Sequence, residues 1–168
     1  MMKYYFVAIL IFNLFLEAND MNSTKNIPPS KGVVVHKSTI AYSGKPIMLM
    51  FDSQTCAYCE KMKREISQEP TLHKVATEFD LYSIPRDQPQ RYKVLGNSTT
   101  TEDLKALYKV KVTPYIVLLT SKGEKIWQIP GYVKPNILAK VMKFVKGVDT
   151  GKYKKEEWKE YLKQNGVI

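Results

Sequence analysis

The sequence predicts an α/β fold in which helices flank a central mixed β-sheet and one extra helix follows at the C-terminus. Two mostly apolar runs, at residues 47–51 and 110–120, have the length and hydrophobicity of strands that are buried on both faces. Helical patterns separate them, and a polar turn at 121–124 returns the chain as an antiparallel hairpin. The 168 residues, 44% hydrophobic and 25% charged, suit one domain with a sizeable core.

The N-terminus has the three zones of a secretory signal peptide. Lys3 precedes thirteen mostly apolar residues, 4–16, and Ala18 follows as the expected cleavage site. The alternative is an uncleaved membrane anchor, although this span is shorter than the roughly 20 residues that cross a bilayer. We expect residues 1–18 to be removed and the protein to be periplasmic or secreted, with anchoring by an uncleaved signal as the second possibility.

The rest of the chain divides into three segments. Residues 19–44 predict a linker or N-terminal arm: residues 19–32 are polar and contain Pro28-Pro29, and residues 33–42 fit either a strand or a short helix. A main domain is expected at 45–147. Residues 148–168 predict a C-terminal helical extension.

The only two cysteines of the chain stand where the first buried strand ends and a helix is predicted to begin. Cys56 lies near the N-cap, where unpaired N–H groups and the helix dipole favour a thiolate. Such positions lower a cysteine pKa from about 8.5 to between roughly 3.5 and 7.5. Cys59 returns to the same side of the helix and can close a disulfide with Cys56. Cys56 is therefore the expected nucleophile and Cys59 the resolving thiol.

The next elements follow from periodicity and from capping residues. The helix that begins at Cys56 has Met62 and Ile66 on its inner face. Thr71 is expected to cap a second helix, and residues 81–84 predict a strand. The segment 85–99, with two prolines and a glycine, predicts a long loop, which is either a lid over the cysteines or an ordinary surface excursion.

The C-terminal half predicts three more helices around the hairpin strand at 125–129. Thr100 opens the first, with Leu104, Leu107 and Tyr108 on one face. Pro135 starts the second and Gly147 ends it. The last begins near Lys154 and places Trp158, Tyr161 and Leu162 on one face.

The cysteine motif and the later elements together resemble the thioredoxin-like family over about residues 45–147. The resemblance is carried by Cys56-Ala57-Tyr58-Cys59 on a helix, by Thr113-Pro114 at the start of a strand, and by Gly131-Tyr132 before an amphipathic helix. The segment from Val145 to Leu162 also resembles the tail of the periplasmic SoxW-like thioredoxins.

The resemblance implies a site and a mechanism. It implies a cis bond between Thr113 and Pro114, with the backbone of Thr113 offered to the substrate. It also implies that Ala57 and Tyr58 contact the substrate, that Cys56 attacks a substrate disulfide and that Cys59 releases the product. No cofactor is expected beyond this redox-active pair.

Two departures from the family pattern stand out. Cytoplasmic thioredoxins have tryptophan before the first cysteine and a buried aspartate six residues before it, where this chain has Thr55 and Met50. Asp52 or Glu60 could replace the missing proton relay through a water molecule, although each is more simply a solvated carboxylate. The dipeptide between the cysteines is neither the reducing Gly-Pro nor the oxidising Pro-His of the family, so the redox direction stays open.

The leading hypothesis is an exported thiol-disulfide oxidoreductase that reduces protein disulfides or thiol-bound sulfur and is kept reduced by a membrane thiol-disulfide electron donor. A disulfide oxidase or isomerase is the alternative within the same chemistry. A copper- or zinc-binding module is the alternative from another class, but a structural zinc site needs four ligands and only His36 and His73 accompany the cysteines. Both histidines are expected to be solvated surface residues.

The charge of the chain bears on its partners. The formal net charge of +10 suits an acidic partner or an anionic membrane surface. The lysines occupy solvent-facing helix positions, so we expect no nucleic-acid partner. We expect a monomer that acts on protein thiols and disulfides.

Overall fold

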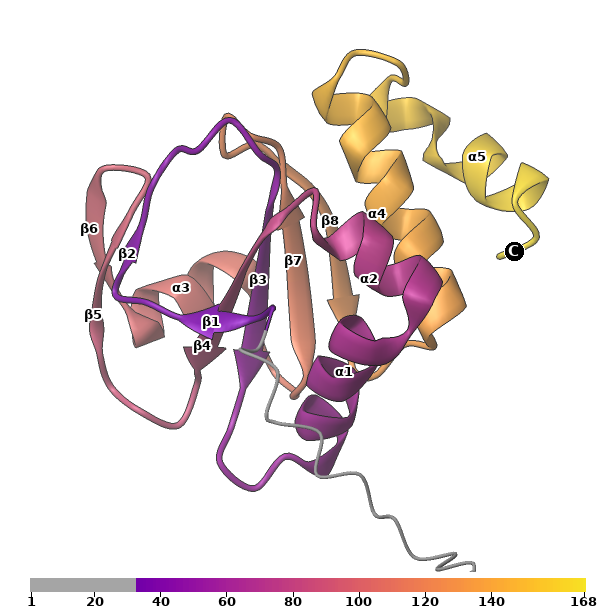
Figure 1. Ribbon diagram of the computed structural model, residues 1–168. Coiled ribbons are helices and arrows are strands. Elements are labelled where there is room, and N and C mark those ends of the chain that lie inside the picture. Colours follow the sequence, from indigo (N-terminus) through magenta and orange to yellow (C-terminus); the bar gives the residue numbers. More distant parts are fainter. Residues whose placement is uncertain (1–32) are drawn as a thin grey trace, which may run out of the picture.

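The computed structural model describes residues 33–168 (Figure 1). The predicted signal peptide and residues 19–32 of the predicted arm lie outside the described residues. A five-stranded mixed sheet forms the centre, with the strand order β1-β4-β3-β7-β8. These strands are β1 (Val35–His36), β4 (Asp80–Pro85), β3 (Ile47–Asp52), β7 (Tyr115–Leu119) and β8 (Lys125–Pro130).

The central strand β3 has one parallel and one antiparallel neighbour. It pairs in parallel with β4 and antiparallel with β7, and β8 continues the sheet antiparallel to β7. All six residues of β3 and all five of β7 are buried. The predicted mixed sheet and its two buried strands are therefore confirmed, although the second strand occupies only Tyr115–Leu119 of the predicted run at 110–120.

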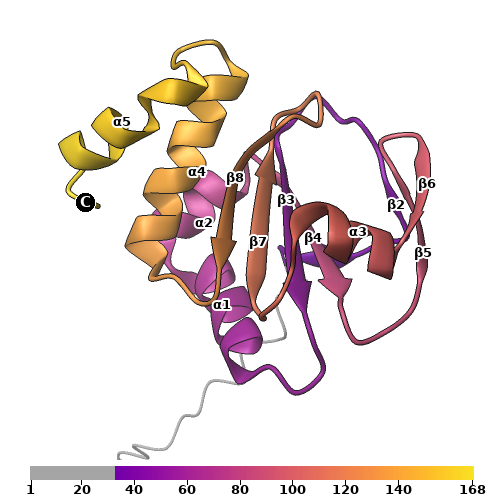
Figure 2. The same cartoon turned by 180° about the vertical axis from the view of Figure 1, so that it is seen from behind.

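Helices cover both faces of the five-stranded sheet, and a second, three-stranded sheet, β2-β5-β6, lies on the same side as α3 (Figures 1 and 2). Met48 and Met50 share one core with α1 (Ala57–Gln68), α2 (Pro70–Ala76) and α4 (Pro135–Asp149). Ile47, Leu49 and Phe51 share the other with α3 (Thr101–Tyr108). Alternate residues of a strand point to opposite faces, so burial of both faces requires the continuous apolar run in β3.

Residues 35–40, placed by prediction in the N-terminal arm, take part in the domain. β1 pairs in parallel with β4 through Val35 and His36. The strand β2 (Thr39–Ile40) pairs in parallel with β5, and Ile40 is fully buried. Of the two conformations that fit residues 33–42, the structure has the strand.

The predicted long loop at 85–99 is wrong in its second half, because β5 (Arg91–Val94) and β6 (Asn97–Thr100) form an antiparallel hairpin. Leu95 and Gly96 form its turn, with φ of 49° and 88°, and positive φ at both central residues suits the twist of paired strands. The buried Tyr92 and Val94 join the core on the face opposite α1. The hairpin is therefore not a lid over the cysteines.

Two details of the helices α2 and α3 differ from prediction, and one agrees with it. Pro70 is the first residue of α2, with Glu69 rather than Thr71 at the N-cap. Thr100 caps α3 as predicted, in a capping box with Asp103. Leu107, predicted to share the inner face, is 65% exposed, whereas Thr101, Leu104 and Tyr108 are the buried residues of α3.

The predicted helix end at Gly147 is wrong, since α4 continues to Asp149. Gly147 instead allows the ring of Tyr153 to approach the helix: a Cβ at this position would overlap Cδ2 of Tyr153. The chain continues through a 3-10 turn, Lys155–Glu157, into α5 (Trp158–Gln164), which confirms the extra C-terminal helix. Within residues 33–168, no helix has the length and apolarity needed to span a membrane.

Candidate active site at the cysteine pair

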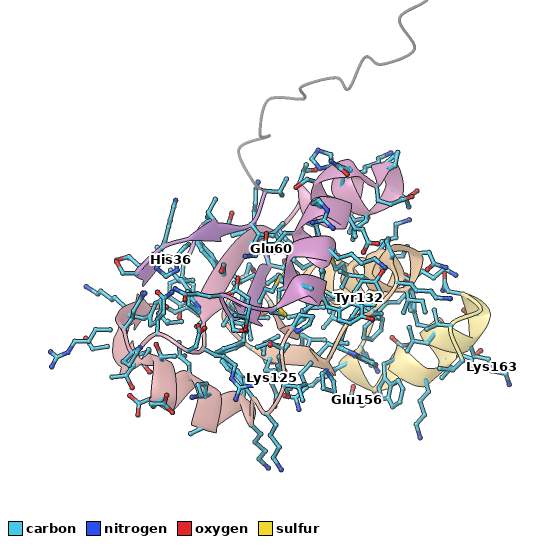
Figure 3. All side chains as sticks on the ribbon, turned by 90° about the horizontal axis from the view of Figure 1, so that it is seen from below. His36, Glu60, Lys125, Tyr132, Glu156 and Lys163 are labelled. Atoms are coloured by element: carbon cyan, nitrogen blue, oxygen red, sulfur yellow. A yellow bond between two sulfur atoms is a disulfide. The ribbon has the colours of Figure 1, made fainter. Side chains whose placement is uncertain are left out.

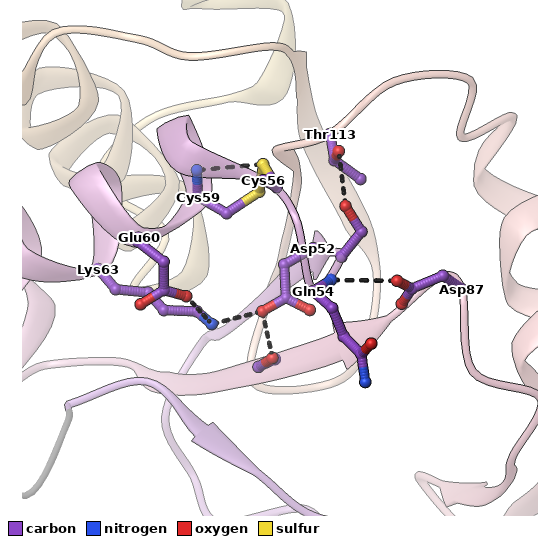
Figure 4. The surroundings of a disulfide bond; sticks show 10 residues. Asp52, Gln54, Cys56, Cys59, Glu60, Lys63, Asp87 and Thr113 are labelled. Carbon is purple, nitrogen blue, oxygen red and sulfur yellow. Dashed lines mark hydrogen bonds and ion pairs between the residues drawn. A yellow bond between two sulfur atoms is a disulfide. The ribbon is translucent and has the colours of Figure 1, made fainter.

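A disulfide joins Cys56 and Cys59 where the C-terminal end of β3 meets the N-terminus of α1 (Figure 4). The two sulfur atoms are 1.99 Å apart and the two Cα atoms 5.2 Å apart. Cys56 is the N-cap of α1, and its Sγ accepts a hydrogen bond from the backbone N–H of Cys59 at 3.1 Å. The predicted cap position of Cys56 is confirmed.

The two cysteines differ in their access to solvent. Cys56 is partly exposed, whereas Cys59 is fully buried and belongs to the core on the α1 face. A sulfur that is exposed and hydrogen-bonded at a helix N-terminus favours the thiolate, which is the reactive form of cysteine. This asymmetry suits attack on an external disulfide by Cys56 and internal resolution by Cys59.

The Thr113–Pro114 peptide bond is cis, and it adjoins the turn that carries Cys56. The hydroxyl groups of Ser53 and Thr113 lie 3.4 Å apart, and Ser53 also accepts the backbone N–H of Cys56 through its carbonyl. Pro114 is buried, and its carbonyl accepts the N–H of Gly131 at 2.8 Å. The backbone N–H and carbonyl of Thr113 form no hydrogen bond with residues 33–168, so they can pair with an extended peptide.

A cluster of charged side chains lies close to the disulfide (Figure 4). Asp52 is 5% exposed; its Oδ2 accepts the hydroxyl of Ser83 at 2.7 Å and lies 2.6 Å from Nζ of Lys63. Nζ of Lys63 also lies 3.0 Å from Oε1 of Glu60. Burial lowers the pKa of Lys63, but the hydrogen bonds and charges of both carboxylates outweigh burial and raise it above 10.5.

This cluster bears on the missing relay aspartate. Met50 stands six residues before Cys56, where cytoplasmic thioredoxins have the buried aspartate, and it is fully buried. Asp52 lies two residues further along the same face of β3. Asp52 and Glu60, the two predicted alternatives, both contact Lys63, a residue that was not predicted to belong to the site. Proton transfer by either carboxylate stays a prediction.

Two tyrosines lie beside the disulfide. Tyr58, between the two cysteines, is 60% exposed, and its ring centroid lies 5.5 Å from that of Tyr132 at an interplanar angle of 39°. The Tyr132 hydroxyl donates to the carboxylate of Glu65, 2.9 Å from the nearer oxygen. Neither contact of Tyr132 was predictable from a local motif, since Tyr132 and Glu65 are 67 positions apart in the sequence.

Neither histidine joins the cysteines. Nδ1 of His36 lies 3.1 Å from the carbonyl oxygen of Ser83, and Nδ1 of His73 lies 3.3 Å from that of Ile66. In the part of the chain that the structure describes, no group of three or more His, Cys, Asp and Glu side chains is placed to hold a metal ion.

Comparison with known proteins identifies a family from the sequence and a fold from the structure, and the two agree. A family model described as a thioredoxin-like domain matches residues 36–146. No curated protein matches significantly. Among solved structures, a thioredoxin-fold protein from Helicobacter pylori is similar with a TM-score of 0.66 and 23% identity, over 76% of this chain and 88% of that one.

A thioredoxin from Thermus thermophilus is also similar, with a TM-score of 0.50 and 21% identity, over 67% of this chain and 91% of that one. An uncharacterised thioredoxin-like protein from Clostridium perfringens has the same TM-score of 0.50 at 21% identity, over 75% of this chain and 90% of that one. At these identities the solved structures support the fold, while the family model covers most of the domain. The chain belongs to the thioredoxin-like family.

Proposed function

We propose that this protein is an exported thiol-disulfide oxidoreductase that reduces protein disulfides or thiol-bound sulfur. The observation that carries the proposal is the asymmetry of the redox pair: Cys56 is accessible and hydrogen-bonded at a helix N-terminus, and Cys59 is buried behind it. Such a pair supplies one sulfur for attack on a substrate and a second for its release.

The reaction runs from the dithiol form to the disulfide form seen in the structure. The Cys56 thiolate attacks one sulfur of a substrate disulfide; the substrate S–S bond breaks, and its other sulfur leaves as a thiolate that takes up a proton. Cys59 then loses its proton and attacks Sγ of Cys56. The Cys56–Cys59 bond forms, the second substrate sulfur leaves, and two electrons have passed to the substrate.

The substrate segment is held by the groups around Cys56. The free backbone groups of Thr113 pair with an extended peptide, beside the buried Pro114, while Ala57 and Tyr58 contact the substrate from the helix. No cofactor takes part in these steps.

The N-terminal pattern supports export, with residues 1–18 as a signal peptide, which N-terminal sequencing of the mature protein would test. Outside the cytoplasm, a membrane thiol-disulfide donor returns the pair to the dithiol form. The C-terminal helix supports a SoxW-like role, in which thiol-bound sulfur is the substrate.

Two serine variants test the mechanism. Cys59→Ser retains the attacking sulfur but not the resolving one, so it should accumulate a mixed disulfide with a model disulfide substrate. Cys56→Ser should form no such adduct and reduce no substrate. Mass spectrometry of the intact protein separates the two results. Turnover by Cys56→Ser would contradict the mechanism.

A further inference from the structure

The rings of Tyr58 and Tyr132 pack against each other beside the Cys56–Cys59 disulfide, and we call these two residues the tyrosine platform. Tyr58 stands between the two cysteines and is 60% exposed. Tyr132 directly follows Gly131 and packs against Tyr58, with ring centroids 5.5 Å apart. In the view from below, Tyr132 lies beside α1 at the end of the domain that carries the disulfide (Figure 3). Tyr132 is partly buried and packs against the core, whereas the ring of Tyr58 is largely open to solvent beside the reactive sulfur.

The platform is held in place before any substrate arrives. The Tyr132 hydroxyl donates to the carboxylate of Glu65, and Nζ of Lys61 lies 4.5 Å from the centroid of its ring. Glu65 and Lys61 come from α1, one turn apart, and their charged groups are 3.9 Å from each other. An aromatic ring fixed in advance loses little conformational entropy on binding, which favours a recognition role.

The platform is also tied to the segment that can bind the substrate backbone. The N–H of Gly131 donates to the carbonyl of Pro114 at 2.8 Å, so Tyr132 is placed relative to Thr113 and its free backbone groups. In an extended peptide that pairs with Thr113, alternate side chains point to the same side. A cysteine that points toward Cys56 therefore shares its side with the residues two positions before and after it.

We infer that the tyrosine platform selects disulfide substrates that carry an aromatic side chain two residues from the reacting cysteine. The inference rests on the proposed oxidoreductase function and adds a substrate class to it. Tyr58 and Tyr132 contact the incoming ring, which packs offset or edge-on against them. Glu65 and Lys61 are positioning residues that hold Tyr132.

Three disulfide-linked peptides test the inference with the reduced full-length protein. One has alanine around its cysteine, one has phenylalanine two positions before and after it, and one has phenylalanine at the two adjacent positions. We expect the second peptide to be reduced about three- to tenfold faster than the first, as for one aromatic contact, and the third to show no gain. Rates are compared as second-order rate constants of a single turnover, in which each Cys56–Cys59 dithiol is oxidised to the disulfide as one peptide disulfide is reduced.

Variants then assign the gain to the platform. Tyr58→Ala and Tyr132→Ala should each bring the ratio of the second to the first peptide close to one. A change in the reduction potential affects both peptides alike and cancels in this ratio. Glu65→Ala should lower the ratio, and Glu65→Gln, which keeps an acceptor for the Tyr132 hydroxyl, should restore part of it.

Tyr42→Ala is the matched control. Tyr42 is 59% exposed, and it lies near the turn between β7 and β8, at the end of the sheet opposite Cys56. This variant should keep the wild-type ratio. Equal rates for all three peptides, or a ratio that survives both tyrosine variants, would overturn the inference while leaving the oxidoreductase function intact. Failure to reduce any peptide or a small disulfide such as bis(2-hydroxyethyl) disulfide would overturn both.

Discussion

At the scale of single residues, the two cysteines show how a short stretch of helix gives two identical side chains different chemistry. Cys56 is the cap of α1 and receives the N–H of Cys59, whereas Cys59 lies one turn inside and is fully buried. Stabilisation of negative charge at the cap lowers the pKa of a thiol, and burial raises it. The different roles of Cys56 as nucleophile and Cys59 as resolving thiol therefore follow from their positions in α1.

Lys63 is the residue whose removal should cost the most among the ion pairs near the disulfide. Its Nζ lies 2.6 Å from the buried carboxylate of Asp52, and its own side chain is 29% exposed. Lys63→Met would leave a buried carboxylate without its cation. We expect a loss of about 1–3 kcal/mol in the free energy of unfolding at pH 7, after allowance for solvent screening. Urea denaturation measures it.

Lys105→Met provides the matched control, because Lys105 pairs with Glu102 at 2.7 Å on the surface of α3, where Glu102 is 69% exposed. Its loss should change the free energy of unfolding by about 0–0.5 kcal/mol. Equal effects of the two substitutions would contradict the assigned importance of the Asp52–Lys63 pair.

The same pair predicts a dependence of stability on alkaline pH. The pKa of Lys63 is raised above 10.5 in the folded protein. A group with a raised pKa stabilises the folded state fully below its unfolded pKa, and this contribution is lost as the pH rises through the folded pKa. The stability difference between the wild type and Lys63→Met should thus hold from pH 7 to about 10 and shrink above about 10.5.

At the scale of elements, the C-terminal extension docks on α4 through aromatic side chains. The ring of Tyr153 stacks on that of Phe144 with centroids 5.9 Å apart, and Tyr161 contacts both rings. The missing side chain at Gly147 makes room for Tyr153, whose backbone N–H donates to the Gly147 carbonyl. A residue that looks like a helix stop in the sequence is therefore a packing site.

Gly147→Ala should destabilise the protein by about 1–3 kcal/mol, because the new methyl group would overlap the Tyr153 ring. In a helix interior, glycine to alanine would otherwise stabilise by about 0.5–1 kcal/mol. In the Tyr153→Ala background the same substitution should therefore be neutral or stabilising. Thermal unfolding of the four proteins gives the coupling, and equal effects in both backgrounds would contradict the packing role.

Elements with strong patterns were predictable from sequence, and those held by distant partners were not. The runs in β3 and β7, the cap at Thr100 and the start of α4 at Pro135 all carry local signals. By contrast, β1 and β2 are two residues long, which is too short to show the alternation of a strand in the sequence. The turn of the β5–β6 hairpin uses Leu95-Gly96, which lacks the Asn-Gly or Asp-Gly signal of such turns.

The same distinction applies to the site. Cys56 and Cys59 are adjacent in one helix turn, and their spacing alone predicts that they can pair. The bonds from Asp52 to Ser83 and from Tyr132 to Glu65 join residues 31 and 67 positions apart. Only the folded sheet and the packing of α1 bring these side chains together, so no local pattern could identify them.

At the scale of the whole molecule, the fold places every part of the proposed chemistry at one end of the sheet. Cys56 follows β3, Pro114 precedes β7 and Gly131 follows β8, and these strands are neighbours. Because β3 and β7 are antiparallel, the C-terminal end of one meets the N-terminal end of the other. The scaffold thereby fixes the redox pair against the groups that hold a substrate.

We infer that Cys56 and Cys59 form a reversible redox pair that works as a reductant. The most direct test is the reduction potential of the pair, measured by alkylation mass shifts after equilibration in graded thiol buffers. We expect a reversible two-electron titration at about −270 mV, as for reducing thioredoxins. A potential of about −120 mV, or cysteines that never titrate reversibly, would contradict a role as reductant.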